Sequence, residues 1–357
     1  MVLHSIYFVL AFVISVVITG IIAVVMRRLG IIDHPREKNS RKIHTRAVAL
    51  GGGVALYLTF FVLVFVVWFF ERGVSTLFDS HAIIGLFVGS TILMIGGIID
   101  DKYTIRPRYQ IIAPILACLV IIMLNIGPQV ISNLWGGVLD LSAIQWSLPP
   151  FIHVILFADI LLFIWLFGMM FTTKFLDGLD GLVAGVVSIA AIVMYLVSIQ
   201  PQWYDPTVAF LSIIFAGTCL GFLVWNFNPA KIFLGEGGSL MTGFILGCLA
   251  IISKSKIAVT VMVIGIPMID VIRVMVMRVR KGKPVYIGDR EHLHYRLLES
   301  GLSHRQSVLL LYAISSLFGM TALFLQAEHQ MIAFSFLFVL MLLIGLWFSK
   351  REQKDQS

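Results

Sequence analysis

Hydrophobic residues gather in long runs along this chain, and short polar stretches separate one run from the next. A helix of about 20 apolar residues crosses the bilayer core, so each long run predicts a membrane-spanning helix. Eleven spans are expected, and the eighth of them is short. The segment 129–150, which carries two tryptophans and a Pro–Pro pair, is predicted to be an interfacial hairpin. The spans lie at roughly 3–26, 51–70, 81–99, 109–127, 151–170, 182–199, 207–225, 240–253, 257–277, 307–326 and 331–349.

The composition also indicates an integral membrane protein. Hydrophobic residues make up 59% of the 357 residues and charged residues only 13%, and the mean hydropathy is +0.98. We therefore predict an all-α polytopic membrane protein with about 10–11 transmembrane helices around a cytoplasm-facing cleft, in a single domain over 1–357. The first run is too long for a signal-peptide core and is expected to be retained. The net charge of +7 does not indicate a nucleic-acid partner, because cytoplasmic loops of membrane proteins are basic anyway.

Lysine and arginine are distributed unevenly between the two sides of the predicted bundle. The stretches 27–50 and 278–306 are rich in both residues, whereas the loops of opposite parity hold only Arg72, Lys254 and Lys256. The positive-inside rule then places the N-terminus outside and the C-terminal tail inside. With eleven spans, every unusual polar stretch faces the cytoplasm, which favours a cytoplasmic active site. These stretches lie at 27–50, 100–108, 171–181, 226–239 and 278–306.

Two acidic pairs stand at predicted helix ends. Asp100 and Asp101 end the third span, and adjacent carboxylates raise each other's pKa unless a cation holds them. Oxygen ligands without nearby Cys or His suit a hard cation, Mg²⁺ or Mn²⁺. The alternative is an acidic helix end that pairs with Lys102 or Arg106.

The second pair, Asp177 and Asp180, is interleaved with glycine between two spans. The two acids share one face if the turn is helical. Glycine lets a ligand approach the backbone closely, and a loop-to-helix junction offers N–H groups to phosphate. The alternative is a turn with solvated acids.

Two further stretches carry candidate ligands for phosphate. Residues 235–239 are rich in glycine and are interpreted as a phosphate cradle, in which Glu236 completes the metal site. In the stretch 289–296, His292, His294 and the arginines are suited to a diphosphate, because the histidine spacing does not match a helical zinc pair. That stretch has an alternative role as a basic loop for membrane lipids.

Acidic residues also occur within the predicted spans. Asp270 and Arg273 are spaced to pair within one helix. Asp159 is interpreted as a structural acid packed against a neighbouring helix. Taken together, the polar stretches predict a site for a metal-bound, phosphate-rich substrate at the inner membrane surface, as phosphoryl transfer requires.

These motifs, in this order, resemble the polyprenyl-phosphate N-acetylhexosamine-1-phosphate transferases. The family includes the phospho-MurNAc-pentapeptide translocase and the GlcNAc-1-phosphate transferases that begin O-antigen and teichoic acid synthesis. The likeness covers nearly the whole chain. It rests on Asp100-Asp101-Lys102, Asp177-Gly178-Leu179-Asp180-Gly181-Leu182, Asn226 to Pro229, Phe233 to Leu240, and His292-Leu293-His294-Tyr295-Arg296-Leu297.

The resemblance implies ten or eleven helices around a cytoplasmic cleft in a bacterial plasma membrane. It implies that undecaprenyl phosphate attacks the β-phosphorus of a UDP-HexNAc with Mg²⁺, which gives a lipid diphospho-sugar and UMP, the first membrane step of a cell-envelope glycopolymer. The x-His-x-His-x-Arg spacing favours the GlcNAc branch. The implied catalytic residues are Asp100 (a candidate base), Asp101, Asp177, Asp180 and Glu236, with Asp100, Asp101 and Glu236 on the metal. The nucleotide-sugar is assigned to Asp177, Gly178, Asp180, Asn226, Phe233 (stacked on uracil), His292, His294 and Arg296, and the lipid phosphate to Lys42, Arg46 and Lys102 as well as the Asp100–Asp101 pair.

Two positions depart from the family pattern, which usually has Asp at 236 and Asn at 174, where this chain has Glu236 and Lys174. A changed donor or a lost activity therefore stays open, as does a homodimer. Three other classes are weighed. An ion-coupled transporter would place its acids at the membrane midplane. An intramembrane aspartyl protease needs Gly-x-Gly-Asp, and a CDP-alcohol phosphotransferase needs Asp-Gly-x-x-Ala-Arg; the sequence contains neither pattern.

Overall fold

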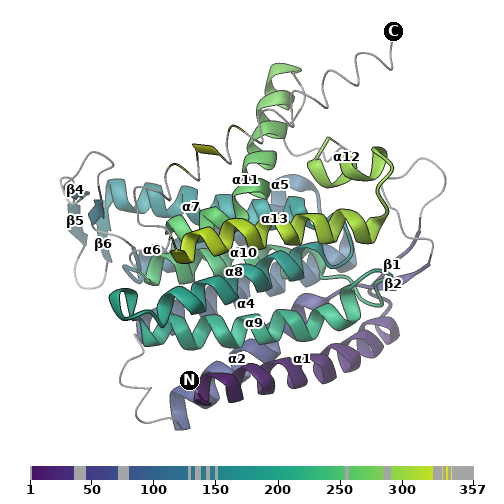
Figure 1. Ribbon diagram of the computed structural model, residues 1–357, viewed down its shortest axis with the longest axis horizontal. Coiled ribbons are helices and arrows are strands. Elements are labelled where there is room, and N and C mark those ends of the chain that lie inside the picture. The colour runs from purple at the N-terminus through teal and green to yellow at the C-terminus, as the bar shows by residue number, and fades with distance from the viewer. Residues whose placement is uncertain are drawn as a thin grey trace.

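The computed structural model of the protein describes most of the chain, and its long elements are helices (Figure 1). The described residues are 2–35, 46–70, 80–127, 130–132, 138–141, 145–148, 152–253, 257–282, 284, 291–324, 332, 335, 336 and 339. The helices are α1 (Val2–Arg28), α2 (Gly52–Phe70), α4 (Ser80–Tyr103), α5 (Pro107–Gln110), α6 (Ile112–Met123), α7 (Leu156–Leu176), α8 (Leu182–Ser198), α9 (Pro206–Asn226), α10 (Gly235–Ile252), α11 (Ile257–Arg280), α12 (Leu293–Glu299) and α13 (His304–Phe324), with a 3₁₀ turn at Pro201–Trp203.

The predicted class, an all-α polytopic membrane protein, is confirmed. Within the described ranges, eight helices are long and apolar enough to span a membrane, while α8 and the α5–α6 segment are shorter apolar helices. Together they coincide with the first ten predicted spans. The eleventh, 331–349, lies almost wholly outside the described residues.

Short strands form at both ends of the bundle (Figure 1). At one end β1 (Ile32–Asp33) pairs with β2 (Val48–Ala49). At the other, β3 (Val130–Ser132) pairs with β4 (Val138–Asp140), and β5 (Gln145–Leu148) pairs with β6 (Ile152–Ile155), all antiparallel. The hairpin predicted over 129–150 is therefore present, as two β-hairpins.

The predicted start of the fifth span at residue 151 is wrong, because β6 takes up its first residues and α7 begins at Leu156. Asp159 stands in the first turn of that helix, and its Oδ2 accepts a hydrogen bond from the Ile155 backbone N–H at 2.9 Å. Asp159 is thus a structural acid as predicted, but it acts on the start of its own helix. In place of the expected packing against a neighbouring helix, the carboxylate binds the backbone N–H of Ile155, just before its own helix.

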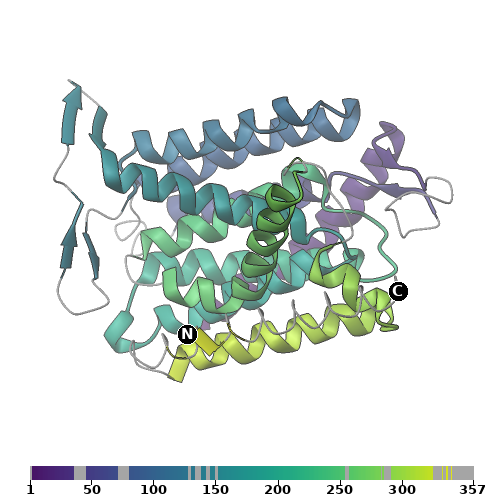
Figure 2. The ribbon, with the colours of Figure 1, turned by 90° about the horizontal axis from the view of Figure 1, so that it is seen from above.

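The interior of the bundle is built around α9 and α10, which are almost wholly buried. Outer helices such as α1 keep an exposed face of large apolar side chains, including Val13, Val17 and Ile21. Such a face is stable against lipid but costly against water. Both views show α11 inclined to the other long helices (Figures 1 and 2), with its end leading to α12.

Candidate active site

All five polar stretches predicted to share one side of the membrane contribute to a single cavity of about 330 Å³. This volume lies within the range of small-molecule sites, about 300–1,000 Å³. The prediction that these stretches face the same side is therefore confirmed for the residues at the cavity. The lining residues are Asp33, Leu50, Asp101, Lys174, Asp177, Gly178, Leu179, Asp180, Asn226, Phe233, Gly235, Glu236, Ser239, Tyr295 and His304.

Backbone hydrogen bonds fasten the start of α2 to the segment before α10. The Phe233 N–H donates to the Ala49 carbonyl at 2.8 Å, and the Gly52 N–H donates to the Phe233 carbonyl at 2.9 Å. The Gly53 N–H donates to the Leu234 carbonyl at 2.8 Å. Because these hydrogen bonds join main-chain atoms, the backbone of Phe233 is held in the cavity wall independently of its own side chain.

The glycines at the start of α10 serve different purposes. A Cβ atom on Gly237 would lie 3.2 Å from Cα of Gly97 in α4, and one on Gly238 would lie 2.7 Å from Cα of Gly53 in α2. These two glycines therefore pack helices together, and their role in a phosphate cradle stays a prediction. Gly235 differs, because its φ of +78° favours glycine and it lines the cavity.

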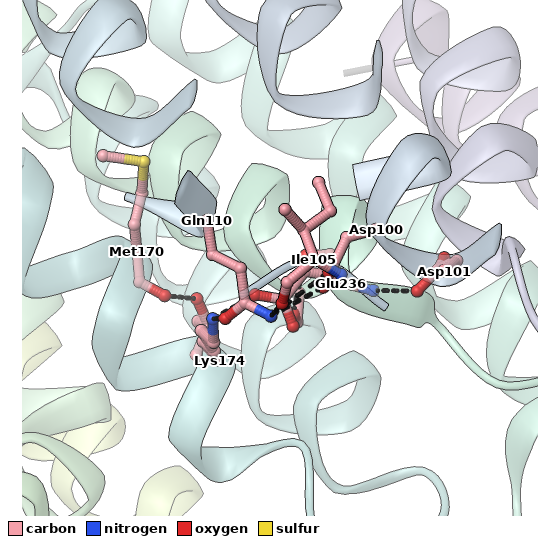
Figure 3. A network of polar contacts seen from close by, with 9 residues as sticks. Asp100, Asp101, Ile105, Gln110, Met170, Lys174 and Glu236 are labelled. Atoms are coloured by element: carbon pink, nitrogen blue, oxygen red, sulfur yellow. Dashed lines mark hydrogen bonds and ion pairs between the residues drawn. The ribbon is translucent and has the colours of Figure 1, made fainter. Parts of the chain in front are cut away.

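Asp100 and Asp101 point in different directions (Figure 3). The Asp101 carboxylate lines the cavity, and its Oδ1 accepts a hydrogen bond from the Glu236 N–H at 3.0 Å, in the first turn of α10. An anion is favoured at such a helix start. The Asp100 carboxylate is not among the cavity-lining groups. It accepts hydrogen bonds from the Ile105 N–H at 2.7 Å and from Gln110 Nε2 at 3.2 and 3.0 Å.

Lys174 joins this network from the last turn of α7 (Figure 3). Its Nζ forms an ion pair with Oε1 of Glu236 and donates a hydrogen bond to Oε1 of Gln110 at 3.2 Å. The side chains of Lys174 and Glu236 are 18% and 20% exposed, so the pair is largely shielded from water. The two positions that depart from the family pattern are thus in direct contact.

Asp180 and Asn226 hold two loops of the site together. Oδ2 of Asp180 accepts hydrogen bonds from Asn228 Nδ2 and from the Ala230 N–H, both at 3.0 Å. Oδ1 of Asn226 accepts from the Gly181 N–H at 3.0 Å, while its Nδ2 donates to the Ile232 carbonyl at 2.9 Å. Each side chain therefore positions the loops as well as lining the cavity.

Asp177 lies in a turn between α7 and α8, so the two acids of this motif are not on a helix face. Its carboxyl is open to the cavity, but protein surrounds the cavity on several sides. Reduced hydration, together with the negative charges of Glu236, Asp101 and Asp180, raises the pKa of Asp177 to about 8. This carboxyl therefore titrates near neutral pH.

The two histidines pack behind the cavity. Nδ1 of His292 is 3.0 Å from Oδ2 of Asp270, and the other oxygen of that carboxylate pairs with Arg273 at 2.8 Å, which confirms the predicted pair within α11. The His294 ring stacks on His292 with a centroid distance of 5.7 Å. Nε2 of His294 lies only 2.3 Å from where a Cβ atom on Gly178 would be. The absence of that atom is what allows α12 to close over the turn.

The charge state of His294 follows from this burial. Desolvation, together with the neighbouring His292, lowers the pKa of His294 to about 3, against a smaller opposing effect of Asp270. His294 is therefore neutral at physiological pH. Arg296, also buried, donates from Nε to the Glu291 carbonyl at 3.0 Å.

Two of the three cations assigned to the lipid phosphate, Arg46 and Lys102, are not among the cavity-lining residues. Arg46 is exposed, and so is Lys102, whose Nζ lies over the ring of Tyr103 at 5.3 Å. Lys42 falls outside the described residues, as do positions 289 and 290 of the last loop. Their roles stay predictions.

Several cavity residues were not found from the sequence. His304 carries no motif of its own, Asp33 belongs to no candidate site in the sequence, and Tyr295 stands in the histidine motif without an assigned role. Gln110, which binds Lys174 beside the cavity, carries no motif either. Ser239 closes the glycine-rich segment on the cavity side. The one available signal was position, since Asp33 and Tyr295 lie in stretches predicted to share one side with the acids.

Carboxylate oxygens are suitable ligands for Mg²⁺ or Mn²⁺, but the present arrangement does not fit a preformed metal centre. Among the residues described, no three His, Cys, Asp or Glu side chains are grouped closely enough to hold one ion. The Glu236 carboxylate is instead engaged by the Lys174 ammonium.

Comparisons with known proteins agree with this site. The sequence model described as Glycosyl transferase family 4 matches residues 83–254. The chain is 26% identical over 348 residues to the probable undecaprenyl-phosphate N-acetylglucosaminyl 1-phosphate transferase of Bacillus subtilis, covering 95% of this chain and 90% of that protein. It is 30% identical to the decaprenyl-phosphate N-acetylglucosaminephosphotransferase of Mycobacterium leprae, covering 82% and 76%. It is 26% identical to the undecaprenyl-phosphate alpha-N-acetylglucosaminyl 1-phosphate transferase of Escherichia coli K12, covering 85% and 79%.

Proposed function

Because this chain belongs to glycosyl transferase family 4, we propose that it transfers N-acetylglucosamine 1-phosphate from UDP-GlcNAc to undecaprenyl phosphate. The relatives named above carry that activity in their names, with undecaprenyl or decaprenyl phosphate as the lipid. An oxygen of the lipid phosphate would form a new bond to the β-phosphorus of the donor. The bond from that phosphorus to the bridging oxygen would break, and UMP would leave.

The observation that carries the proposal is the position of the cavity. Its acids and Phe233 stand at the ends of apolar helices, where a lipid phosphate in the membrane and a soluble nucleotide can meet. An ion-coupled transporter would instead need its charged residues near mid-span. We further propose that this end of the bundle faces the cytoplasm of a bacterium and that the N-terminus lies outside, as the lysine and arginine distribution favours.

The charges of the cavity bear on what else the reaction needs. Five carboxylates line it, on Asp33, Asp101, Asp177, Asp180 and Glu236, against the single ammonium of Lys174 among the described lining residues. Even with Asp177 protonated, the acids outnumber the ammonium, so a diphosphate would be repelled from such a cavity unless further positive charge entered with it. Dependence on Mg²⁺ or Mn²⁺ is therefore part of the proposal, although the residues as arranged do not present a ready-made site.

Roles for individual residues follow from their positions. Asp177 titrates near neutral pH, which suits a group that accepts or returns a proton during the reaction. Phe233 lines the cavity, which suits the role of stacking on uracil. Asp180 and Asn226 would act by holding the loops that surround the nucleotide. The Asp100 carboxylate accepts hydrogen bonds from the α4–α5 turn, whereas the Asp101 carboxylate lines the cavity. Asp101 is therefore better placed than Asp100 to contact the substrate.

The direct test is UMP release by the purified protein in detergent, supplied with undecaprenyl phosphate, Mg²⁺ and a panel of UDP-sugars. The expected result is release that requires both lipid and divalent cation, fastest with UDP-GlcNAc. Asp101→Asn should reduce turnover at least about 100-fold without loss of folding, because it removes a charge at the reaction centre. UMP release without lipid, or none from a folded sample beside an active relative, would overturn the proposal.

A further inference from the structure

Lys174 places a positive charge inside a group of carboxylates. It lies at the last turn of α7, with its ammonium against Oε1 of Glu236 from α10. Lys174 is the only lysine or arginine among the described residues that line the cavity. Among the described lining residues, Lys174 therefore supplies the main positive charge that faces the acids of the cavity.

The ammonium is held from a second side. It donates a hydrogen bond to Oε1 of Gln110 at 3.2 Å, and Nε2 of the same amide donates to both oxygens of Asp100 (Figure 3). Gln110 Nε2 also bonds the Ile105 carbonyl at 3.2 Å, so the amide cannot turn without losing three contacts. Lys174 is thus fixed in place by a chain of contacts that runs from Glu236 to Asp100.

This arrangement explains why no three acidic side chains are grouped around a common point in the described part of the chain. Glu236 is the acid that would join Asp101 and Asp177, because its charge acts on both. The carboxylate is instead turned to the ammonium. A divalent ion bound at the same carboxylate would stand close to the ammonium, and their mutual repulsion would weaken the binding of both.

We propose that the Lys174 ammonium is a built-in cation of this cavity, and that it competes with a divalent metal ion for the Glu236 carboxylate. The inference rests on the proposed function for the expectation that a divalent ion enters the cavity. It adds that the wild-type protein binds this ion weakly, because the ion must displace Lys174 first. Metal affinity is then set by a residue that is not a metal ligand.

The test measures metal binding without any substrate. Mn²⁺ is titrated into the purified full-length protein in detergent, and free Mn²⁺ is followed by its electron paramagnetic resonance signal. Lys174→Met removes the charge and keeps most of the side-chain volume, so it should tighten Mn²⁺ binding at least tenfold. Lys174→Gln serves as a second variant, since it keeps a polar group for Gln110 should the methionine variant fail to fold.

The chain offers a matched control in Lys281, which forms a 3.1 Å ion pair with Glu291 outside the cavity lining. Lys281→Met should leave Mn²⁺ affinity unchanged. Unchanged or weaker binding by both Lys174 variants would overturn the inference, whether or not the wild-type protein binds Mn²⁺. UMP release is a separate measurement, so that result would leave the proposed transferase activity standing.

A second comparison separates competition for Glu236 from a general effect of charge. In a Glu236→Gln background the contested carboxylate is gone, so adding Lys174→Met should change Mn²⁺ affinity less than twofold. If the same tenfold tightening persists in that background, Lys174 acts on the other acids at a distance and competition for Glu236 is refuted.

Discussion

The contact between Gly97 and Gly237 gives the sharpest prediction about how the fold positions the site. A Cβ atom on Gly97 would lie 2.1 Å from both N and Cα of Gly237, and these are backbone atoms that cannot rotate away. Ordinary contact begins at 3.4 Å, so Gly97→Ala must push α4 and α10 apart by about 1.3 Å. Overpacking of this kind costs typically about 1–3 kcal/mol of stability.

The displacement matters because Asp101 follows Gly97 by one helical turn. Its hydrogen bond to the Glu236 N–H, now 3.0 Å, would lengthen to about 4.3 Å if the helices part by that amount, which is beyond hydrogen-bond range. A misplacement of about 1 Å at a reacting group can cost roughly 100-fold in rate. Gly97→Ala should therefore lower turnover by about that factor in a protein that still folds.

Two assays check this prediction, with Gly168→Ala as the control. Turnover is measured as UMP release, and folding is measured with a thiol-reactive dye, because all three cysteines are buried and become reactive only on unfolding. Gly168 lies within α7 with nothing within 4 Å of its would-be Cβ atom, so alanine there should be neutral or stabilise by up to about 1 kcal/mol. Near-normal turnover of Gly97→Ala would refute the close approach of α4 and α10 as the device that positions Asp101.

Three further predictions concern charge. The raised pKa of Asp177, about 8, means that its carboxyl binds a proton more tightly in the folded protein, so the stability of the fold falls as pH rises from 4 to 8. Asp177→Asn should abolish turnover. The dye assay should nevertheless show that this variant is more stable at pH 8 by about 1–2 kcal/mol, after allowance for cavity water. The lowered pKa of His294 has the opposite effect on stability. The contribution of the neutral ring is fully present above pH 6.5 and is lost as pH falls towards 3. His294→Gln should therefore reduce the fall of the melting temperature over this pH range. The double exchange Lys174→Met with Glu236→Gln should cost less stability than the sum of the two single exchanges, because each single change leaves one charge of a shielded pair unmatched and the double change leaves none; additive losses in the dye assay would contradict the coupling.

Much of the architecture could be predicted from the sequence because the membrane restricts the options. Apolar runs of sufficient length must form helices, and the acids between them fall at helix ends. Counting spans then placed five polar stretches on one side, and residues from all five line the cavity. The acids Asp101, Asp177, Asp180 and Glu236 were identified for the same reason.

What the sequence did not reveal depends on which helices become neighbours. The roles of Gly237 and Gly238 follow from α4 and α2 lying against α10, and no local pattern specifies that pairing. Consecutive residues on a helix point about 100° apart, so Asp100 and Asp101 face different surroundings although they look alike in the sequence. Gln110 enters the site only because α5 lies beside the end of α7.

The contact between Lys174 and Glu236 changes how the two departures from the family pattern are interpreted. Considered separately, an added lysine and a lengthened acid each suggest a damaged site. In the structure the ammonium meets the carboxylate, and neither charge is left alone in a poorly hydrated cavity. A neutral side chain at position 174 would leave the acids of the cavity without that compensation, so the longer reach of glutamate and the charge of lysine make sense only together. The pair therefore favours an adapted active site over a decayed one.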